Sequence, residues 1–344
     1  MTSSAPSYRL SDVMMTESSP FSFSLIVPLY RSEETIDKLV TRLEGLDFHS
    51  AWQAIFIDDG SPDQSYNVLC RRLNKSPLNA VVIRHTRNFG EHQAVLTGYR
   101  HAEGEYFINI DDDLQNPPEE AIRLLDYAKD NDLDVTYGNH ICKKHNIFRN
   151  LGSVFAKLTA RWLLDLPNSY YLSSFRCVKR LVAEKITCIN GPYVYLDGLL
   201  SQVTTRIGSL DVRHDPRDAG SSGYNLRRLV RLWLVILTSF SLMPLRFASL
   251  IGIGASLIGA VSLAYILISS LFGRLDVAGW ASVISSILFF GGIQCLLLGM
   301  VGEYIGRIYL TVSGKPQAHI RNLAWYGKMK SPVKAQSLHV MSTI

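Results

Sequence analysis

Two long stretches without a charged side chain constrain the fold of this chain more than any other feature. They run from Phe247 to Phe272 and from Ala278 to Gly302. Each is longer than the about 20 apolar residues that a helix needs to cross a bilayer. Basic residues lie on the outer side of both stretches, while the turn between them holds only Arg274 and Asp276. By the positive-inside rule, the two stretches are predicted to form a membrane hairpin with both ends on the cytoplasmic side.

The chain before the hairpin has a different pattern. From Phe23 onward, short apolar runs alternate with longer amphipathic ones, which is typical of parallel strands joined by crossover helices. The predicted strands span 23–29, 54–57, 80–83, 106–110 and 134–137, and the predicted helices span 34–43, 64–73, 92–100 and 118–129. This pattern predicts an α/β domain with a mainly parallel sheet.

Polar residues follow four of the predicted strands at the point where each strand ends. In a parallel sheet these ends meet at one edge, where ligands bind. The first strand contains Pro28 and is followed by Tyr30 and Glu33, without the glycine-rich turn of a dinucleotide-binding site. The later loops add Asp58, Asp59, Arg87 and the triplet 111–113. Four such loops on one edge predict a ligand-binding site.

The triplet Asp111, Asp112 and Asp113 follows the apolar run of the fourth strand. Adjacent carboxylates repel each other, so they commonly share protons or a cation. Because Mg²⁺ and Mn²⁺ are bound by one or two carboxylates and completed by substrate phosphates, a metal site is one interpretation. A solvated acidic turn before the next helix is the alternative. Alternation along the strand end predicts Asp111 and Asp113 on one side and Asp112 on the other.

Two basic segments interleave cations with apolar and aromatic side chains. They span residues 139–167 and 225–244. Helices of this composition lie on anionic lipid, and the first segment also offers its cations to a phosphate. A basic helix with a solvated face is the alternative for the first segment. No basic-aromatic pattern indicates nucleic-acid binding.

The remaining features bound the domain organisation. The five cysteines are scattered without a C-x-x-C pair and are predicted to be reduced packing residues. The N-terminus lacks a basic start followed by an apolar core, so it is predicted to be a loose tail rather than a signal peptide. The expected parts are a disordered tail (1–20), the α/β catalytic domain (21–224), an amphipathic interface helix (225–244), two transmembrane helices (245–306) and a cytoplasmic tail (307–344).

A series of short motifs resembles the family 2 glycosyltransferases of GT-A fold. They are IVPLY (26–30), DDGS (58–61), RNFG (87–90), DDDLQNPPE (111–119), SSFR (173–176), RHDPRDAGSSGY (213–224) and MPLR (243–246). With the hairpin that follows, the chain resembles the polyprenyl-phosphate branch, which includes dolichyl-phosphate mannose synthase and bacterial undecaprenyl-phosphate glycosyltransferases. The resemblance covers residues 23–320, and the order and spacing of the motifs make it specific.

The resemblance implies two groups of donor-binding residues. The nucleotide-sugar pocket would be lined by residues of the strand-end loops and of a later loop that closes over the donor, namely Pro28, Tyr30, Glu33, Asp58, Asp59, Arg87, Asp111, Arg213 and Arg217. The metal, Mg²⁺ or Mn²⁺, would be held with the donor diphosphate by Asp111, Asp113 and Gln115.

The resemblance also implies an acceptor site. Arg149 and Ser153 match the R-x-x-x-S motif that meets the acceptor phosphate in this branch, with His140 nearby. Together with Asp111 and Asp113, they are the residues that the resemblance assigns to catalysis.

Two positions depart from the branch. The Asp that commonly precedes its GFR or DFR motif is missing from residues 170–176, and Gly223 stands where the Lys of an S-K-Y motif is expected. A polyprenyl phosphate is already an anion near neutral pH. The missing acid therefore need not disable the enzyme, because such a phosphate can attack without a protein base.

The implied activity is inverting transfer of one sugar from a UDP- or GDP-linked donor to an undecaprenyl-type phosphate. The product would be a lipid-linked monosaccharide, made with the catalytic domain on the cytoplasmic side of the inner membrane. Small residues such as Gly252, Gly259 and Gly291 leave open whether the hairpin packs on itself or against a second copy in a homo-oligomer.

Two other interpretations stay open. A processive polysaccharide synthase of the same superfamily carries Q-x-x-R-W and an ED pair, whereas here Leu158 replaces the Gln and Leu196 precedes Asp197 in the ED region. A non-catalytic membrane scaffold that binds a nucleotide sugar is the third interpretation, because an expected Asp and an expected Lys are missing.

Overall fold

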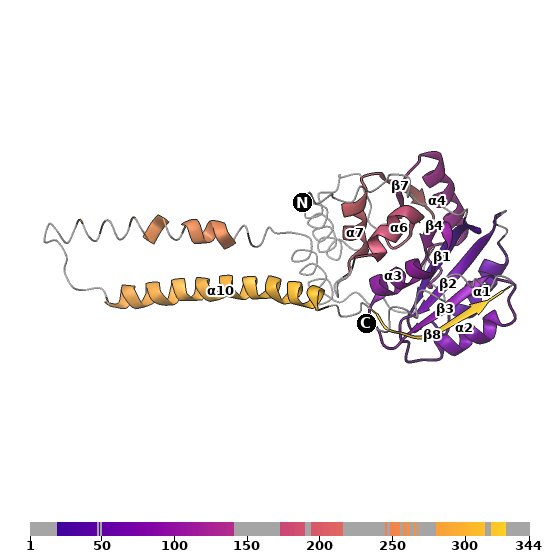
Figure 1. Cartoon of the computed structure of the whole chain (residues 1–344), viewed down its shortest axis with the longest axis horizontal. Helices are drawn as coiled ribbons and strands as arrows, with labels where there is room; N and C mark the ends of the chain where they lie inside the picture. Colours follow the sequence, from indigo (N-terminus) through magenta and orange to yellow (C-terminus); the bar gives the residue numbers. More distant parts are fainter. Residues whose placement is uncertain are drawn as a thin grey trace, which may run out of the picture.

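The computed structural model describes residues 19–46, 48, 50–140, 173–189, 194–215, 245, 248–254, 257–259, 261, 265, 268, 280–313 and 318–327. Its centre is an eight-stranded sheet with the order β7-β5-β6-β4-β1-β2-β3-β8 (Figure 1). The strands are β1 (Phe21–Leu29), β2 (Trp52–Asp58), β3 (Ala80–His85), β4 (Gly104–Asn109), β5 (Val135–His140), β6 (Arg176–Lys179), β7 (Ile207–Val212) and β8 (Ile320–Tyr326).

The four central strands β4, β1, β2 and β3 are parallel, as the sequence pattern predicts. All five predicted strands and all four predicted helices are present, with ends that differ by at most three residues. The predicted helices are α1 (Ile36–Glu44), α2 (Ser65–Leu73), α3 (Glu91–His101) and α4 (Glu119–Asp130). The parallel order brings the ends of β1, β2, β3 and β4 to one edge, where the polar loops follow.

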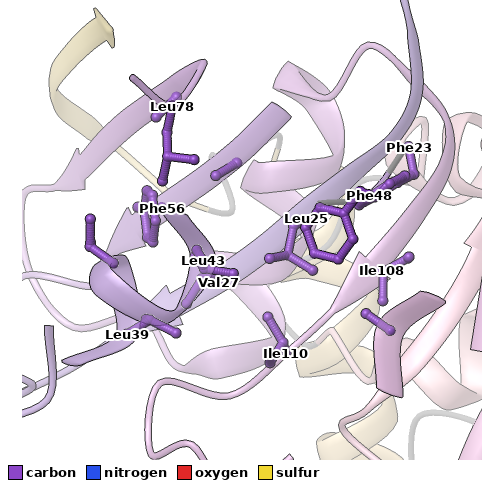
Figure 2. Packing of buried hydrophobic residues seen from close by; sticks show 14 of the residues in the cluster. Phe23, Leu25, Val27, Leu39, Leu43, Phe48, Phe56, Leu78, Ile108 and Ile110 are labelled. Atoms are coloured by element: carbon purple, nitrogen blue, oxygen red, sulfur yellow. The ribbon is translucent and has the colours of Figure 1, made fainter. Parts of the chain in front are cut away.

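Helices cover both faces of the sheet. One core cluster contains buried residues of α1, α2 and α4, and the other contains those of α3, α6 (Arg180–Thr187) and α7 (Leu196–Val203). Because side chains alternate along a strand, Phe23, Leu25 and Val27 of β1 join the first cluster, whereas Ile26 joins the second. Figure 2 shows the three β1 side chains within the first cluster. Each such buried side chain stabilises the fold by about 1.5–3 kcal/mol.

Several short elements were not predicted from the sequence. These are β6, α6, α7 and β7, which are only four to eight residues long. Strand β6 is antiparallel to β4 and places Arg176 opposite Asn109. Strand β4 ends at Asn109, so the acidic triplet lies in the turn beyond it. The strand alternation that was expected to orient the triplet therefore does not reach it.

The helix α10 (Trp280–Val312) extends away from the sheet (Figure 1). Judged by length and composition, its part from Phe290 to Val312 is able to cross a membrane, and it is the one helix of this kind in the described part of the chain. A shorter apolar helix, Ala248–Gly259, lies within the first predicted span. Large apolar side chains of α10, such as Ile287 and Ile305, are exposed.

After α10 the chain returns to the sheet as β8, antiparallel to β3. This segment belongs to the predicted C-terminal tail, in which no strand was expected. Leu323 of β8 packs against the core cluster that contains α3. Just before β8, the His319 carbonyl accepts a hydrogen bond from the Thr86 N–H at 2.9 Å. The segment of the predicted hairpin thus lies, in the sequence, between strands of one sheet.

Removing β8 is expected to lower the thermal stability of the α/β domain. A chain that ends at Ser313 loses the β3–β8 ladder, in which each hydrogen bond contributes about 1 kcal/mol, so its unfolding midpoint should fall by about 5 °C or more. A chain that ends after Gly327 keeps β8 and is the matched control. Thermal unfolding of both in detergent makes the comparison. Equal midpoints for the two truncations would show that β8 is not part of the cooperative unit.

Candidate functional site

The acidic triplet is held by a serine hydroxyl from each side. The Ser174 Oγ donates a 2.7 Å hydrogen bond to Asp111 Oδ2, and the Ser32 Oγ donates to Asp112 Oδ2. Asp113 Oδ1 accepts the Gln115 N–H at 3.1 Å. Asp111 and Asp112 therefore have different partners, because they lie in a turn between two neighbouring loops and not because a strand alternates.

The backbone of this turn is unusual at Leu114, which has a positive φ of 60°. Its side chain is only 9% exposed and belongs to the first core cluster. A leucine in this conformation costs free energy, and burial of its side chain offsets that cost. Leu114 thus anchors the acidic turn to the core of the domain.

The carboxylates of the turn are hard to ionise together. Burial, followed by repulsion from Glu91 and Asp113, raises the pKa of Asp111 to about 7, although the hydrogen bond from Ser174 opposes the rise. Burial also raises the pKa of Asp112 to about 6. The hydrogen bond from Ser32 lowers this pKa, and repulsion from Asp111 and Asp113 raises it. A bound cation would relieve this repulsion.

Glu91, the first residue of α3, adds a further carboxylate near the turn. Reduced hydration of its carboxyl group raises the pKa of Glu91. The charge of Arg176 opposes this rise, and repulsion from Asp197 and Asp113 adds to it. The residue as a whole remains exposed at the sheet edge. Glu91 is not among the site residues predicted from the sequence. Its position directly after the RNFG motif was the available signal.

A buried ion pair lies beside these carboxylates. Arg176 of β6 is 1% exposed, and its Nη1 donates to Asp197 Oδ1 at the start of α7. The Tyr137 hydroxyl donates to the same oxygen at 2.9 Å. The charge of Arg176 is therefore already shared with Asp197. No sequence-based prediction assigned a role to this arginine.

Among the described residues, no group of three or more His, Cys, Asp and Glu is arranged to hold a metal ion. Asp111 and Asp113 nevertheless offer the two carboxylates with which proteins commonly bind Mg²⁺, the remaining ligands being phosphate oxygens and water. The backbone carbonyl of Gln115 accepts the Asp215 N–H at 2.8 Å, which connects the acidic turn to the later loop.

The loops after β1 and β2 are joined by hydrogen bonds. The Tyr30 N–H donates to Ser32 Oγ, and the Arg31 N–H donates to Ser61 Oγ, both at 3.1 Å. Tyr30 itself is 44% exposed. Since Ser32 also donates to Asp112, the carboxylate of Asp112 helps to fix the loop that presents Tyr30. Asp112 therefore has a structural role in this loop.

Asp59 is engaged within the protein through both carboxylate oxygens. Oδ1 accepts from the Phe89 N–H at 2.9 Å and lies 2.8 Å from His85 Nδ1, and Oδ2 accepts from the Gly90 N–H at 2.7 Å. This carboxylate therefore holds the RNFG loop, at whose exposed side Arg87 lies. Gly60 has a φ of 64°, and a Cβ there would lie 2.4 Å from the backbone of Arg87.

The other predicted nucleotide-site residues lie in the ends of β1 and β2 or directly after them. Asp58 is fully buried, forms an ion pair with Arg84 at 3.1 Å, and has a pKa raised by burial. Pro28 lies within β1, and the exposed Glu33 accepts the Gln64 N–H through Oε2. Like Asp59, Asp58 and Glu33 thus have partners within the protein.

The later loop begins beside the acidic turn. Arg213 pairs with Asp215 at 2.8 Å, and the backbone of Asp215 bonds to that of Gln115. Arg213 therefore lies near the predicted donor site. Arg149, Ser153 and Arg217 lie outside the described residues, as do residues 141–167 of the first basic segment and the whole second segment, 225–244. His140 is described only as the last backbone position of β5.

Comparison with known protein families matches residues 24–183 to the model of glycosyl transferase family 2 and residues 243–308 to the GtrB C-terminal hairpin. Residues 24–183 therefore form a glycosyl transferase family 2 domain. The family match begins in β1 and ends in α6, so it contains the acidic turn and all four strand-end loops. The second match supports the hairpin that the charge-free stretches predict.

The alignments with curated relatives cover most of this chain. The undecaprenyl-phosphate 4-deoxy-4-formamido-L-arabinose transferase of Yersinia pestis is 29% identical over 304 residues, which cover 87% of this chain and 93% of the relative. The enzyme of the same name from Yersinia pseudotuberculosis serotype IB matches equally. Among solved structures, the glucosyl-3-phosphoglycerate synthase of Mycobacterium tuberculosis, in complex with Mn²⁺, uridine diphosphate and phosphoglyceric acid, has a TM-score of 0.48 at 16% identity and covers 64% of this chain and 78% of its own.

Proposed function

We propose that this glycosyltransferase moves one sugar from a nucleotide diphospho-sugar to a polyprenyl phosphate at the cytoplasmic face of the inner membrane. The observation that carries the proposal is the acidic turn at the edge of a family 2 domain, on a chain that continues into a hairpin. The names of the curated relatives support an undecaprenyl-type acceptor.

The donor would bind across the loops after β1, β2, β3 and β4. Tyr30 is exposed beside this edge and offers an aromatic surface to the base, while Arg87 and Arg213 offer charge to the diphosphate. Asp111 and Asp113 would hold Mg²⁺ or Mn²⁺ against the diphosphate, where a bound cation neutralises the charge of the leaving group. Asp59 and Asp112 would act indirectly, by fixing the loops that carry these contacts.

The acceptor phosphate would be received by Arg149 and Ser153, with His140 and Arg217 near the two substrates. One of its oxygens attacks the anomeric carbon from the side opposite the nucleoside diphosphate, which inverts the configuration at that carbon. The attacking oxygen is already negatively charged near neutral pH, so no protein base is needed. Ser174 at the position before Phe175-Arg176 is consistent with such a mechanism, because serine is a poor base.

The function is tested by a donor screen with the full chain in detergent. Undecaprenyl phosphate is supplied with a panel of labelled UDP- and GDP-sugars, with Mg²⁺, with Mn²⁺ or with a chelator. We expect one donor to place its label in the lipid fraction, and the chelator to prevent this. Label in a long polymer without a lipid intermediate would favour a processive synthase, and no transfer from any donor would contradict the proposal.

A further inference from the structure

The motif Ser173-Ser174-Phe175-Arg176 lacks the acid that its family branch commonly carries, yet it contacts the acidic turn directly. The Ser174 hydroxyl donates its hydrogen bond to Asp111 Oδ2 at 2.7 Å. We propose that Ser174 is a positioning residue that holds the Asp111 carboxylate in its metal-binding orientation, and that Arg176 and Asp197 keep Ser174 in place. This inference rests on the proposed function, because it assumes that Asp111 holds the metal.

Ser174 is attached to a rigid part of the fold. The next residue, Phe175, is fully buried, and its N–H donates to Ser173 Oγ at 3.2 Å. Its carbonyl accepts the Gly138 N–H at 2.9 Å. A Cβ at Gly138 would lie 2.4 Å from the Phe175 ring, so the ring packs directly on the β5 backbone. These contacts fix the backbone immediately after Ser174.

Arg176 connects the same turn to α7. Its Nε donates a long hydrogen bond of 3.4 Å to the Ser174 carbonyl, and its Nη1 donates to Asp197. The register of β6 against β4 places Arg176 opposite Asn109, two residues before Asp111. The antiparallel strand and the buried ion pair therefore bring the Ser174 hydroxyl to the acidic turn from a fixed direction.

A serine suits this position better than an aspartate would. Its hydroxyl donates to one oxygen of Asp111 and leaves Oδ1 available to a cation, whereas a carboxylate at 174 would add negative charge beside Asp111, Asp113 and Glu91. Carboxylates that bind metals are commonly oriented by such hydrogen bonds, and loss of one partner typically weakens metal binding about 10- to 100-fold.

The test measures Mn²⁺ binding to the full chain in detergent, without sugar donor or lipid, by the electron paramagnetic resonance of free Mn²⁺. Ser174→Ala should weaken Mn²⁺ binding about tenfold, and Ser174→Thr should keep it near the wild-type value because it retains the hydroxyl. Ser201→Ala is the matched control. Ser201 is also a half-buried serine, but its hydroxyl donates to the Gly198 carbonyl at 3.0 Å. Its loss should leave Mn²⁺ binding unchanged.

Turnover gives a second readout. Excess Mn²⁺ should restore the kcat of Ser174→Ala, because the metal ligands themselves remain. Wild-type Mn²⁺ affinity in Ser174→Ala would overturn this inference and leave the proposed function intact. If the wild-type chain binds no Mn²⁺ even with UDP, both the proposed metal site and the role of Ser174 are wrong.

Discussion

Replacing Asp113 by Ala, or Asp111 by Asn, is expected to abolish sugar transfer while the fold is kept. Both side chains lie in the turn after β4, and neither belongs to the apolar core. Each replacement removes one of the two carboxylates proposed to hold the metal at the donor diphosphate. We expect kcat to fall by about a thousandfold or more, since charge stabilisation of the leaving group would be lost. Radiolabelled transfer to undecaprenyl phosphate measures the loss.

Asp112→Asn is the matched control for this prediction. Asparagine keeps an oxygen that can accept the Ser32 hydroxyl, so the loop that presents Tyr30 should stay in place. We expect a loss of at most about tenfold, because one hydrogen bond to a charged group is weakened. Full activity in Asp113→Ala, or an equal loss at all three positions, would contradict the proposed division of roles.

The raised pKa of Asp111 should make the stability of the metal-free protein depend on pH. The pKa of Asp111 is about 7, above the ordinary value near 4, so in the absence of metal the folded chain binds more protons than the unfolded chain between these pH values. Stability of the metal-free protein should therefore fall as pH rises from about 4 to 7. Asp111→Asn removes this contribution, and its unfolding midpoint at pH 8 should exceed that of the wild type.

Breaking the buried ion pair of Arg176 and Asp197 is expected to cause the largest loss of stability. Arg176 is 1% exposed and Asp197 is 6% exposed, so removing one partner leaves the other charge buried. Arg176→Met or Asp197→Leu alone should lower the free energy of unfolding by about 3–5 kcal/mol. The double variant should recover most of this loss, because it leaves no unpaired charge. Chemical unfolding of all four chains forms the double-mutant cycle.

An exposed pair on the same side of the sheet is the control. Arg180 and Glu184 are one turn apart on α6, with Nε and Oε1 separated by 2.7 Å and both side chains solvent-accessible. Arg180→Ala should cost less than about 1 kcal/mol. If Arg176→Met lowers the free energy of unfolding no more than Arg180→Ala does, the buried ion pair does not stabilise the site as proposed.

Features of the fold that depend on a long residue pattern could be predicted from the sequence. Alternating apolar runs predicted the central parallel strands, and the two charge-free stretches predicted the hairpin that the family comparison supports. Strand ends also predicted correctly that Tyr30, Asp59 and Asp113 follow strands at one edge. These features depend on local residue order and on the general geometry of parallel sheets.

Contacts between distant segments were not predictable in this way. The strand β8 follows the hairpin, and nothing in Ile320–Tyr326 indicates that it pairs with β3. Ser174 and Arg176 lie more than 60 residues after Asp111, and only the antiparallel pairing of β6 with β4 brings them together. The hydrogen bonds from the RNFG loop to the Asp59 oxygens also join segments about 30 residues apart. Each of these contacts depends on how distant segments pair in the folded domain, which the local sequence does not indicate.

The central claim is that one sugar is transferred to a lipid phosphate by this hairpin-bearing glycosyltransferase. Mass spectrometry of the lipid fraction, after reaction of the full chain with undecaprenyl phosphate and its accepted donor, tests it most directly. The account predicts a single new lipid whose mass has increased by one sugar residue, with one nucleoside diphosphate released for each. Unchanged undecaprenyl phosphate, with the label in free sugar or in a long polymer, would contradict it.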